Sequence, residues 1–167
     1  MLETSTLVID PWAPSAPLGA APAWMRSIVD DGGRSLGFVR FVGNPSAFWF
    51  KWLRRVRLEV YETDDASHLM SVTRAWGFLR HWQIHDADEH HVGGVYLQTI
   101  VTSENQAIAY LDLGESRMLD PSGRVLARFE PAGNRLKLTF AANLPLNPFE
   151  RMVLLGTVLS LDAAPPG

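Results

Sequence analysis

The sequence predicts a mainly β fold in which short antiparallel strands surround one hydrophobic helix near the C-terminus. Residues 24–141 alternate apolar and polar side chains with a period of two, and turns rich in Asp and Gly interrupt the alternation at short intervals. Residues 152–161 then form the most apolar stretch of the chain. Because alternation buries one face of a sheet and short antiparallel strands need their edges covered, the pattern favours a sandwich or a closed barrel.

The alternation is clearest in three runs, at residues 56–60, 125–129 and 136–140. In each run every second side chain is apolar and is expected to face the core. These expected inward side chains are Val56, Leu58, Val60, Val125, Ala127, Phe129, Leu136, Leu138 and Phe140.

A hairpin unit recurs along the chain. Residues 28–37 and 118–127 both consist of an apolar strand, an Asp-led turn with Gly at its fourth position and a returning strand, and residues 58–65 and 82–88 are looser copies. Asp accepts hydrogen bonds from nearby backbone N–H groups, and Gly adopts positive φ without strain. These signals predict about ten strands in residues 24–141, and residues 7–9 can add another.

The C-terminal helix has clear boundaries. Asn147 can cap its first turn, Pro148 suits the first helical position, and Glu150 completes a capping box. The helix is therefore expected over residues 148–161. It is too short to cross a bilayer, which takes about 20 apolar residues.

This helix has no polar stripe at any helical angle, so it should be buried on all sides. At about 1.5 Å per residue it is about 21 Å long, which matches a strand of six or seven residues. We expect it to run through the middle of a barrel, where Gly156, Thr157 and Ser160 would allow close contact with the strands. The alternatives are a helix packed in an ordinary sheet-and-helix core and one exchanged with a partner molecule.

Composition excludes several classes of protein. The chain has 167 residues, a net charge of −3 and no cysteine. The length suits one domain with a sizeable core. The lack of cysteine excludes disulfides, thiolate metal sites and a cysteine nucleophile, and the near-neutral charge argues against a protein that grips nucleic-acid phosphates.

Both termini are expected to lie outside the barrel. Residues 1–23 lack the features of a secretory signal, and four prolines within residues 11–22 favour an extended arm or linker. A proline-rich ligand for a partner domain is the alternative interpretation of this arm. Residues 24–162 are then the single barrel domain, and residues 163–167 a disordered tail.

The order of these pieces resembles the tubby C-terminal-like superfamily, and within it the LURP-one-related and phospholipid-scramblase branch. The matching pieces are the repeated hairpins and the terminal helix, at residues 28–42, 58–74, 82–97, 118–129 and 151–162. The resemblance implies a closed antiparallel β-barrel of about 12 strands that encloses the hydrophobic helix.

The resemblance also implies a link to membranes. Tubby domains bind phosphoinositides, and scramblases are associated with lipid movement and with calcium. The acidic calcium-binding segment of scramblases has no counterpart here, because residues 141–148 contain no acid. No phosphoinositide-binding motif aligns, so no binding residue is carried over by position.

One segment, residues 47–57, fits contact with lipid. It is rich in aromatic side chains and has four cations and no acid from residue 51 to residue 57. An interfacial helix carries such groups on opposite faces, and each basic residue near an anionic surface contributes about 1 kcal/mol. The aromatic face could instead pack on the barrel wall or cap its open end. The candidate lipid-binding residues are Trp49, Lys51, Trp52, Arg54, Arg55 and Arg57.

Four of the five histidines lie within residues 81–91. On a strand, His81 and His85 would share one face, and His90 or His91 could return across the hairpin to complete a metal site. The spacing matches no established zinc pattern. A polar hairpin that faces water is therefore preferred, no metal or other cofactor is predicted, and a metal-dependent enzyme at this cluster is the least favoured hypothesis.

A basic stripe is a further candidate. Arg124, Arg128, Arg135 and Lys137 are outward residues of two neighbouring strands and could receive a phosphate headgroup, unless acids such as Glu130 neutralise them. The chain has no nucleophile elbow, phosphate-cradling Gly loop or paired-carboxylate signature, so no catalytic residue is predicted.

These features lead us to expect a non-enzymatic module that binds phospholipid or phosphoinositide headgroups. Its expected location is the cytoplasm, with peripheral contact to a membrane. The alternative is a protein-interaction or scaffold barrel that uses exposed aromatics and the proline arm. Nucleic acid is not an expected partner, and the sequence does not fix the oligomeric state.

Overall fold

The computed structural model describes residues 1–14, 24–42, 56–63, 66–74, 81–142 and 147–163. This part of the chain contains 13 strands and one helix, α1, which spans Pro148–Leu161. The strands are β1 Thr6–Ile9, β2 Ala13–Pro14, β3 Trp24–Val29, β4 Ser35–Val42, β5 Arg57–Glu62, β6 His68–Arg74, β7 His81–Asp86, β8 His91–Tyr96, β9 Thr99–Thr102, β10 Ala107–Asp112, β11 Arg117–Leu119, β12 Val125–Ala132 and β13 Arg135–Phe140.

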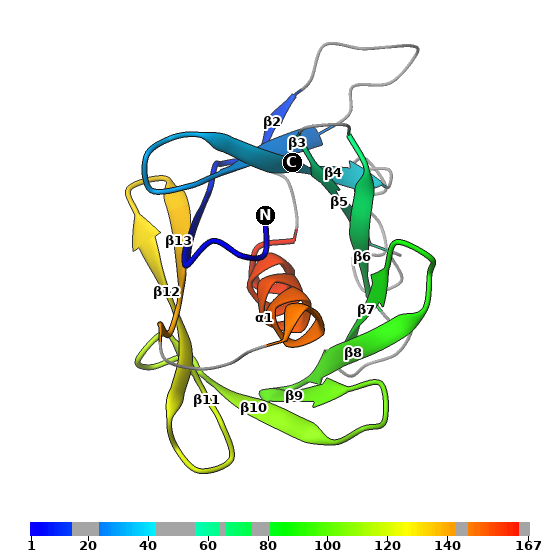
Figure 1. Ribbon diagram of the computed structural model, residues 1–167, viewed down its shortest axis with the longest axis vertical. Coiled ribbons are helices and arrows are strands. Elements are labelled where there is room, and N and C mark those ends of the chain that lie inside the picture. Colours follow the sequence, from blue (N-terminus) through cyan, green and yellow to red (C-terminus); the bar gives the residue numbers. More distant parts are fainter. Residues whose placement is uncertain (15–23, 43–55, 64–65, 75–80, 143–146, 164–167) are drawn as a thin grey trace, which may run out of the picture.

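All strands except β2 close into a twelve-stranded antiparallel barrel (Figure 1). From β3 to β13 each strand pairs with its sequence neighbour, and β1 closes the ring by pairing with β13 on one side and β3 on the other. The two-residue β2 pairs with β3 and lies outside this ring. Closure pairs the strands that would be edges of an open sheet, and the predicted fold class is confirmed.

β1 moves the domain boundary that the sequence placed before residue 24. Leu7 and Ile9 are fully buried, and β1 pairs with four residues of β13. Residues 1–9 therefore belong to the barrel, because β3 and β13 need β1 to close the ring. Residues 15–23 of the expected arm and residues 164–167 of the expected tail lie outside the described residues, whereas Ala163 is buried.

α1 runs along the barrel interior, as predicted (Figure 1). Its side chains are buried continuously over residues 152–159. The predicted capping box is present: Asn147 Oδ1 accepts from the Glu150 N–H at 2.8 Å, and Glu150 Oε2 accepts from the Asn147 N–H at 2.9 Å. Thr157 and Ser160 donate their hydroxyls to helix carbonyls at 2.8 and 2.7 Å, so these polar side chains are satisfied within the helix.

Two glycines allow the helix to approach the wall closely. A Cβ at Gly156 would lie 2.8 Å from the Ile84 side chain, which confirms the predicted role of this glycine. A Cβ at Gly93 in β8 would lie 2.9 Å from the Val153 side chain and 2.4 Å from the Val101 carbonyl oxygen. The shortest distance between α1 and the wall is thus set by residues without a side chain.

The predicted inward side chains mostly form the core. Val125 and Leu136 are half-buried, and the other seven are buried. Leu126, expected to face outward with its polar neighbours, is also buried. The reason is a register shift between Met118 and Leu119 of β11, which leaves Leu126 as the extra residue opposite them.

Four hairpins end in the same turn at the end of the barrel where α1 begins, here called the start rim. In each, one side-chain oxygen accepts hydrogen bonds of 2.8–3.4 Å from the backbone N–H groups two and four residues later. The accepting residues are Asp30, Asp86, Thr102 and Asp120. The residue three positions after each acceptor has positive φ, namely Gly33, Glu89, Asn105 and Gly123. The predicted hairpin repeat is confirmed for Asp30, Asp86 and Asp120, and it extends to a Thr that the sequence pattern missed.

The opposite end, where α1 stops, is here called the end rim. Arg26 projects into the barrel, is 4% exposed, and donates to the Asp162 carboxylate at 2.7 Å and to its carbonyl at 3.3 Å. The Trp12 indole N–H donates to the same carbonyl at 3.2 Å, and the Arg26 guanidinium lies 4.6 Å from the Trp12 ring centroid. A cation at a helix C-terminus interacts favourably with the helix dipole, so Arg26 fixes the helix end to the barrel.

Candidate functional site

Five of the six predicted lipid-binding residues lie outside the described residues: Trp49, Lys51, Trp52, Arg54 and Arg55. The sixth, Arg57, is the first residue of β5 and pairs with Val42, the last residue of β4. Val42 and Arg57 therefore lie side by side at the end rim, on either side of residues 43–55, which lie outside the described residues.

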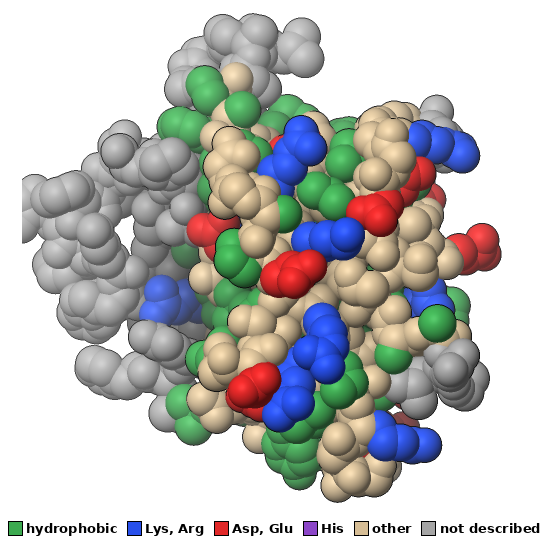
Figure 2. Space-filling view, turned by 90° about the vertical axis from the view of Figure 1, so that its left-hand side faces the viewer, with side chains coloured by type: hydrophobic (Ala, Val, Ile, Leu, Met, Phe, Trp, Pro, Cys, Tyr) green, Lys and Arg blue, Asp and Glu red, His purple; other side chains and the backbone are tan. Residues whose placement is uncertain are grey.

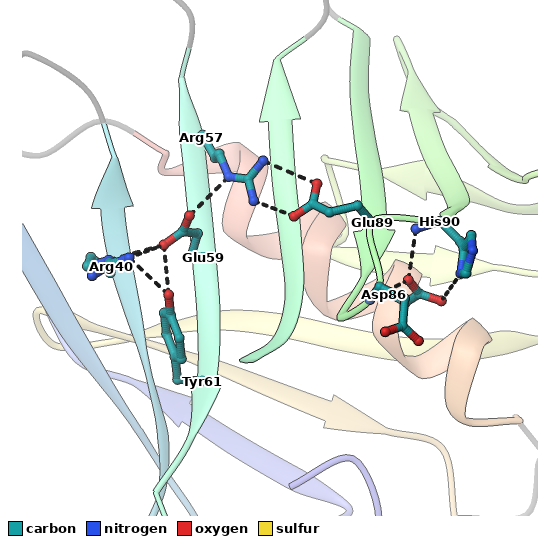
Figure 3. A network of polar contacts seen from close by, with 8 residues as sticks. Arg40, Arg57, Glu59, Tyr61, Asp86, Glu89 and His90 are labelled. Carbon is teal, nitrogen blue, oxygen red and sulfur yellow. Dashed lines mark hydrogen bonds and ion pairs between the residues drawn. The ribbon is translucent and has the colours of Figure 1, made fainter. Parts of the chain in front are cut away.

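Arg57 is held in ion pairs on the barrel wall. Its Nε donates to Glu59 at 3.1 Å, and its guanidinium reaches from β5 to Glu89 in the β7–β8 turn, beyond the intervening strand β6 (Figure 3). The hydrogen bond to Glu89 is the main cause that raises the pKa of Arg57 above its ordinary value. The charge of Arg57 is thus neutralised by two carboxylates.

Glu59 links this pair to a second cation. Arg40 and the Tyr61 hydroxyl both donate to Glu59 Oε2 (Figure 3). Burial by itself would raise the pKa of Glu59, but the hydrogen bonds from Arg40 and Tyr61 outweigh it and the pKa lies below the ordinary value. The outer wall of β4–β8 is therefore a connected ion network.

The end rim exposes apolar and aromatic side chains that the sequence did not single out. Leu97 at the tip of the β8–β9 hairpin is 66% exposed and Leu113 after β10 is 49% exposed. Tyr96 and Tyr110, 37% and 45% exposed, both pair in register with Thr99. The Leu111 N–H also bonds the Gln98 carbonyl at 2.7 Å, so the two hairpin ends lie side by side. We call Tyr96, Leu97, Tyr110 and Leu113 the rim patch.

Leu97 has a backbone conformation that leucine rarely adopts. Its φ is +57°, in the left-handed region that costs an L-residue about 1–2 kcal/mol. Glycine or asparagine is the usual choice there, as at Gly33, Gly123 and Asn105 of the start rim. The sequence signal that could have revealed Leu97 is an apolar residue at a hairpin tip between Tyr96 and a polar residue.

The histidines divide between two places on the outer wall. His85 pairs with His91 across the β7–β8 hairpin, with ring centroids 5.6 Å apart, as the sequence pattern suggested. His81 instead stacks on Tyr96 at 3.7 Å between centroids, four residues away along β7. His68 on β6, which the sequence pattern omitted, lies beside Tyr61, with ring centroids 5.4 Å apart and the rings inclined by 54°.

Several polar atoms on this wall are buried without a hydrogen-bond partner among the described residues. They are His68 Nε2, Ser71 Oγ, His81 Nε2, His85 Nδ1 and His91 Nε2. Burial is the main cause that lowers the pKa of both His81 and His85, and the nearby His91 lowers each of them further. A neutral imidazole with a buried lone pair is the form that binds a metal ion.

A second group of possible metal ligands lies in the β7–β8 turn itself. Ligand atoms of Asp86, Asp88 and His90 lie within 4.8 Å of one another. Asp86 already accepts hydrogen bonds from two backbone N–H groups of the turn, and its carboxylate lies 3.5 Å from His90 Nδ1 (Figure 3). The turn geometry alone explains this arrangement.

Most of the predicted basic stripe is paired with acids. Arg124 binds Asp120 at 2.8 Å, Arg135 binds Asp10 at 2.8 Å, and Lys137 binds Asp31 at 2.9 Å. Figure 2, which faces the side of the barrel where β12 and β13 lie in Figure 1, shows blue cations interspersed with red acids. The wall therefore does not present a continuous basic surface.

A pocket of about 400 Å³ opens at the start rim beside the first turn of α1. Its apolar lining includes Val92, Ile108 and Val153, and its polar rim includes Glu104 and Glu150. Both acids are engaged, since Glu104 accepts from Gln106 and Glu150 belongs to the capping box.

The fold and this wall define the molecule as a twelve-stranded antiparallel barrel filled by its own C-terminal helix. The chain matches no protein-family model, and it shows no significant similarity to a curated protein or a solved structure. Within the described residues, no helix has both the length and the apolar character needed to span a bilayer.

Proposed function

We propose that the protein is a non-enzymatic module that docks on anionic phospholipid membranes through its end rim. The observation that carries this proposal is Leu97, an exposed leucine held at positive φ at the tip of a hairpin. Such a side chain adds nothing to the core and costs stability, so a contact outside the fold is the reason we infer for it.

The rim patch has the composition of a shallow membrane contact. Leu97 and Leu113 form its tips, and burying a leucine side chain contributes about 1.5–3 kcal/mol. Tyr96 and Tyr110 lie on the strands next to these tips, at the ends of β8 and β10. Tyrosine is enriched at the level of lipid headgroups. Two leucines alone give weak and reversible binding, so a second contribution is needed.

The basic segment that follows Val42 supplies that second contribution in this proposal. Val42 and Arg57 pair at the same rim, and the sequence between them contains Lys51, Arg54 and Arg55. Each basic residue near an anionic surface adds about 1 kcal/mol. The barrel wall is a poorer candidate for headgroup binding, because its described cations are mostly engaged in ion pairs. This proposal agrees with the link to membranes that the LURP-one-related and scramblase-like resemblance implies. It includes phosphoinositide headgroups as a ligand class, as the resemblance to tubby domains does.

Vesicle co-sedimentation tests the proposal. The wild-type protein should bind vesicles of phosphatidylcholine with phosphatidylserine or a phosphoinositide more tightly than phosphatidylcholine alone. The double variant Leu97→Ser and Leu113→Ser should weaken binding at least tenfold, since each buried leucine contributes more than 1 kcal/mol. Phe149→Ser is the matched control, because Phe149 is 56% exposed at the start rim.

Equal losses for Phe149→Ser and the double variant would contradict docking through the end rim. If the wild-type protein binds none of these vesicles, the rim patch is better explained as a protein-interaction surface, which is the alternative function expected from the sequence.

A further inference from the structure

Three polar residues lie in one row on the outer wall, far from the rim patch along β7. Ser71 of β6 pairs with His85 of β7, and His85 pairs with His91 of β8. Each carries a buried polar atom with no partner among the described residues, and Ser71 is fully buried although its neighbours Met70 and Val72 fill the core side. Directly opposed residues in a sheet have Cβ atoms about 4.5–5.5 Å apart, so these atoms face a common space.

The separation of the two imidazoles suits a shared metal ion. Rings that bind one tetrahedral zinc ion at Zn–N distances of about 2.0–2.1 Å have centroids about 5 Å apart. The centroids of His85 and His91 are 5.6 Å apart and the rings are inclined by 58°. The unpartnered atoms are one nitrogen on each ring, Nδ1 of His85 and Nε2 of His91. The separation of the two rings is therefore close to the one that a shared ion requires.

Two further ligands are available around this pair. Glu89 lies four residues after His85, in the β7–β8 turn, where its carboxylate accepts hydrogen bonds from Arg57. His68 contributes a third buried nitrogen, Nε2. Three imidazoles and one carboxylate form a donor set that zinc accepts.

We propose that His85 and His91 bind a zinc ion or a similar divalent transition metal, and that Glu89 and His68 move in to complete the coordination, since no three ligand atoms of these four residues lie within 4.8 Å of one another in the described structure. On binding, Glu89 exchanges its ion pair with Arg57 for the metal. The ion then connects β6, β7 and β8 across the outer wall and satisfies buried nitrogens that otherwise lack a partner. Imidazole ligands favour zinc over calcium or magnesium, which prefer oxygen.

The turn cluster of Asp86, Asp88 and His90 is the competing location, and variants distinguish the two. Metal-free protein is titrated with zinc chloride while its melting temperature is recorded. At a zinc concentration 100-fold above the dissociation constant, the melting temperature should rise by about 5 °C or more. His85→Gln and His91→Gln should each weaken zinc binding more than tenfold, whereas His90→Ala and His81→Ala should leave it within threefold.

The absence of a zinc-dependent rise in the wild-type protein overturns the proposal, as does loss of the rise in His90→Ala with retention in His85→Gln. Because a histidine variant can fail to fold, ¹⁵N chemical shifts of the imidazoles are also measured on the wild-type protein. Zinc should shift His85 Nδ1 and His91 Nε2 and leave His81 and His90 unchanged. Shifts confined to His90 contradict the assignment.

Discussion

The start rim and the end rim solve the same problem, the reversal of a hairpin, with different residues. At the start rim, the side chains of Asp30, Asp86, Thr102 and Asp120 accept two backbone N–H groups each. At the end rim, the tip of the β8–β9 hairpin is Leu97 at positive φ and exposed. The polar turns stabilise the barrel locally, whereas Leu97 leaves most of its side chain exposed and has an unfavourable φ. The difference teaches that a hairpin of this barrel can reverse without a side-chain acceptor in its turn, and it is the reason we propose a binding role for the end rim.

The helix runs inside the barrel from the start rim to the end rim, so its close contact with the wall should be the feature most sensitive to substitution. Gly156→Val should destabilise the protein by about 2–3 kcal/mol, because its Cβ would lie 2.8 Å from the Ile84 side chain of the wall. Urea unfolding measures this loss. Gly114→Ala at the end rim is the control: its nearest contact would be 3.5 Å from Asp112 Oδ1, so a change within about 0.5 kcal/mol is expected. Equal losses in the two variants would show that helix packing is not the cause.

The end rim is fastened to the helix by Arg26. Arg26→Leu should cost about 2–3 kcal/mol, because it removes the charge-assisted hydrogen bonds that a buried guanidinium donates to Asp162 and to the Asp10 carbonyl. Arg135→Leu breaks an exposed ion pair with Asp10 and should cost no more than about 1 kcal/mol. Chemical denaturation compares the two variants. If Arg135→Leu costs as much stability as Arg26→Leu, the hydrogen bonds between Arg26 and the end of α1 have no special role.

Lowering the pH should reveal how much the Asp120 turn of the start rim contributes to stability. The Ser122 hydroxyl is the main cause that holds the pKa of Asp120 well below its ordinary value, burial opposes this, and Arg124 assists it. The stabilisation is therefore complete above the unfolded pKa of about 4 and is lost as pH falls below it. Asp120→Asn should lower the melting temperature at pH 7. Below pH 4, the melting temperature of this variant should fall less with pH than that of the wild-type protein.

Asp88→Ala serves as the control for Asp120→Asn, because Asp88 is exposed in the same type of turn and uses only its backbone N–H there. Its melting temperature and acid profile should match those of the wild-type protein. An unchanged acid profile in Asp120→Asn would contradict a stabilising role for the turn carboxylate.

The smallest expected change in stability concerns Leu97, the residue on which the proposed membrane contact depends. Leu97→Asn should increase the free energy of unfolding by about 0.5–1 kcal/mol, since asparagine tolerates positive φ better than leucine. The same variant should bind anionic vesicles more weakly. Urea unfolding and co-sedimentation of one preparation measure both quantities, and a stabilised variant with unchanged vesicle binding would remove the case for Leu97 as a membrane contact.

The parts of the fold that depend on local chemistry could be predicted from the sequence. The capping box of Asn147 and Glu150 locates the start of α1, and Asp30 and Asp120 mark their turns, because each signal acts over a few residues. A strand at residues 7–9 was expected, but its place between β13 and β3 could not be predicted, since it depends on pairing with residues far away in the chain. Thr102 escaped detection because its hydroxyl replaces the expected carboxylate.

The candidate sites were harder to predict than the fold. The sequence suggested that His90 or His91 returns toward His85 across one hairpin, and the structure selects His91, but His68 reaches the same wall from another strand. Leu97 is exposed because it lies at the end of the barrel, and a local sequence pattern does not predict where the barrel ends. Arg57 belongs to a segment whose composition suggests lipid binding. Its ion pair with Glu89 depends instead on the order of the strands in the sheet.

The depth of each rim at a membrane surface tests the central claim most directly. The chain has no cysteine, so Leu97→Cys and Glu104→Cys each provide one site for an environment-sensitive fluorophore, at the end rim and the start rim respectively. With anionic vesicles, the label at position 97 should shift to the blue and be quenched by quenchers attached to lipid chains, while the label at position 104 should stay in water. Equal responses at both positions, or a response at position 104 alone, would contradict docking through the end rim.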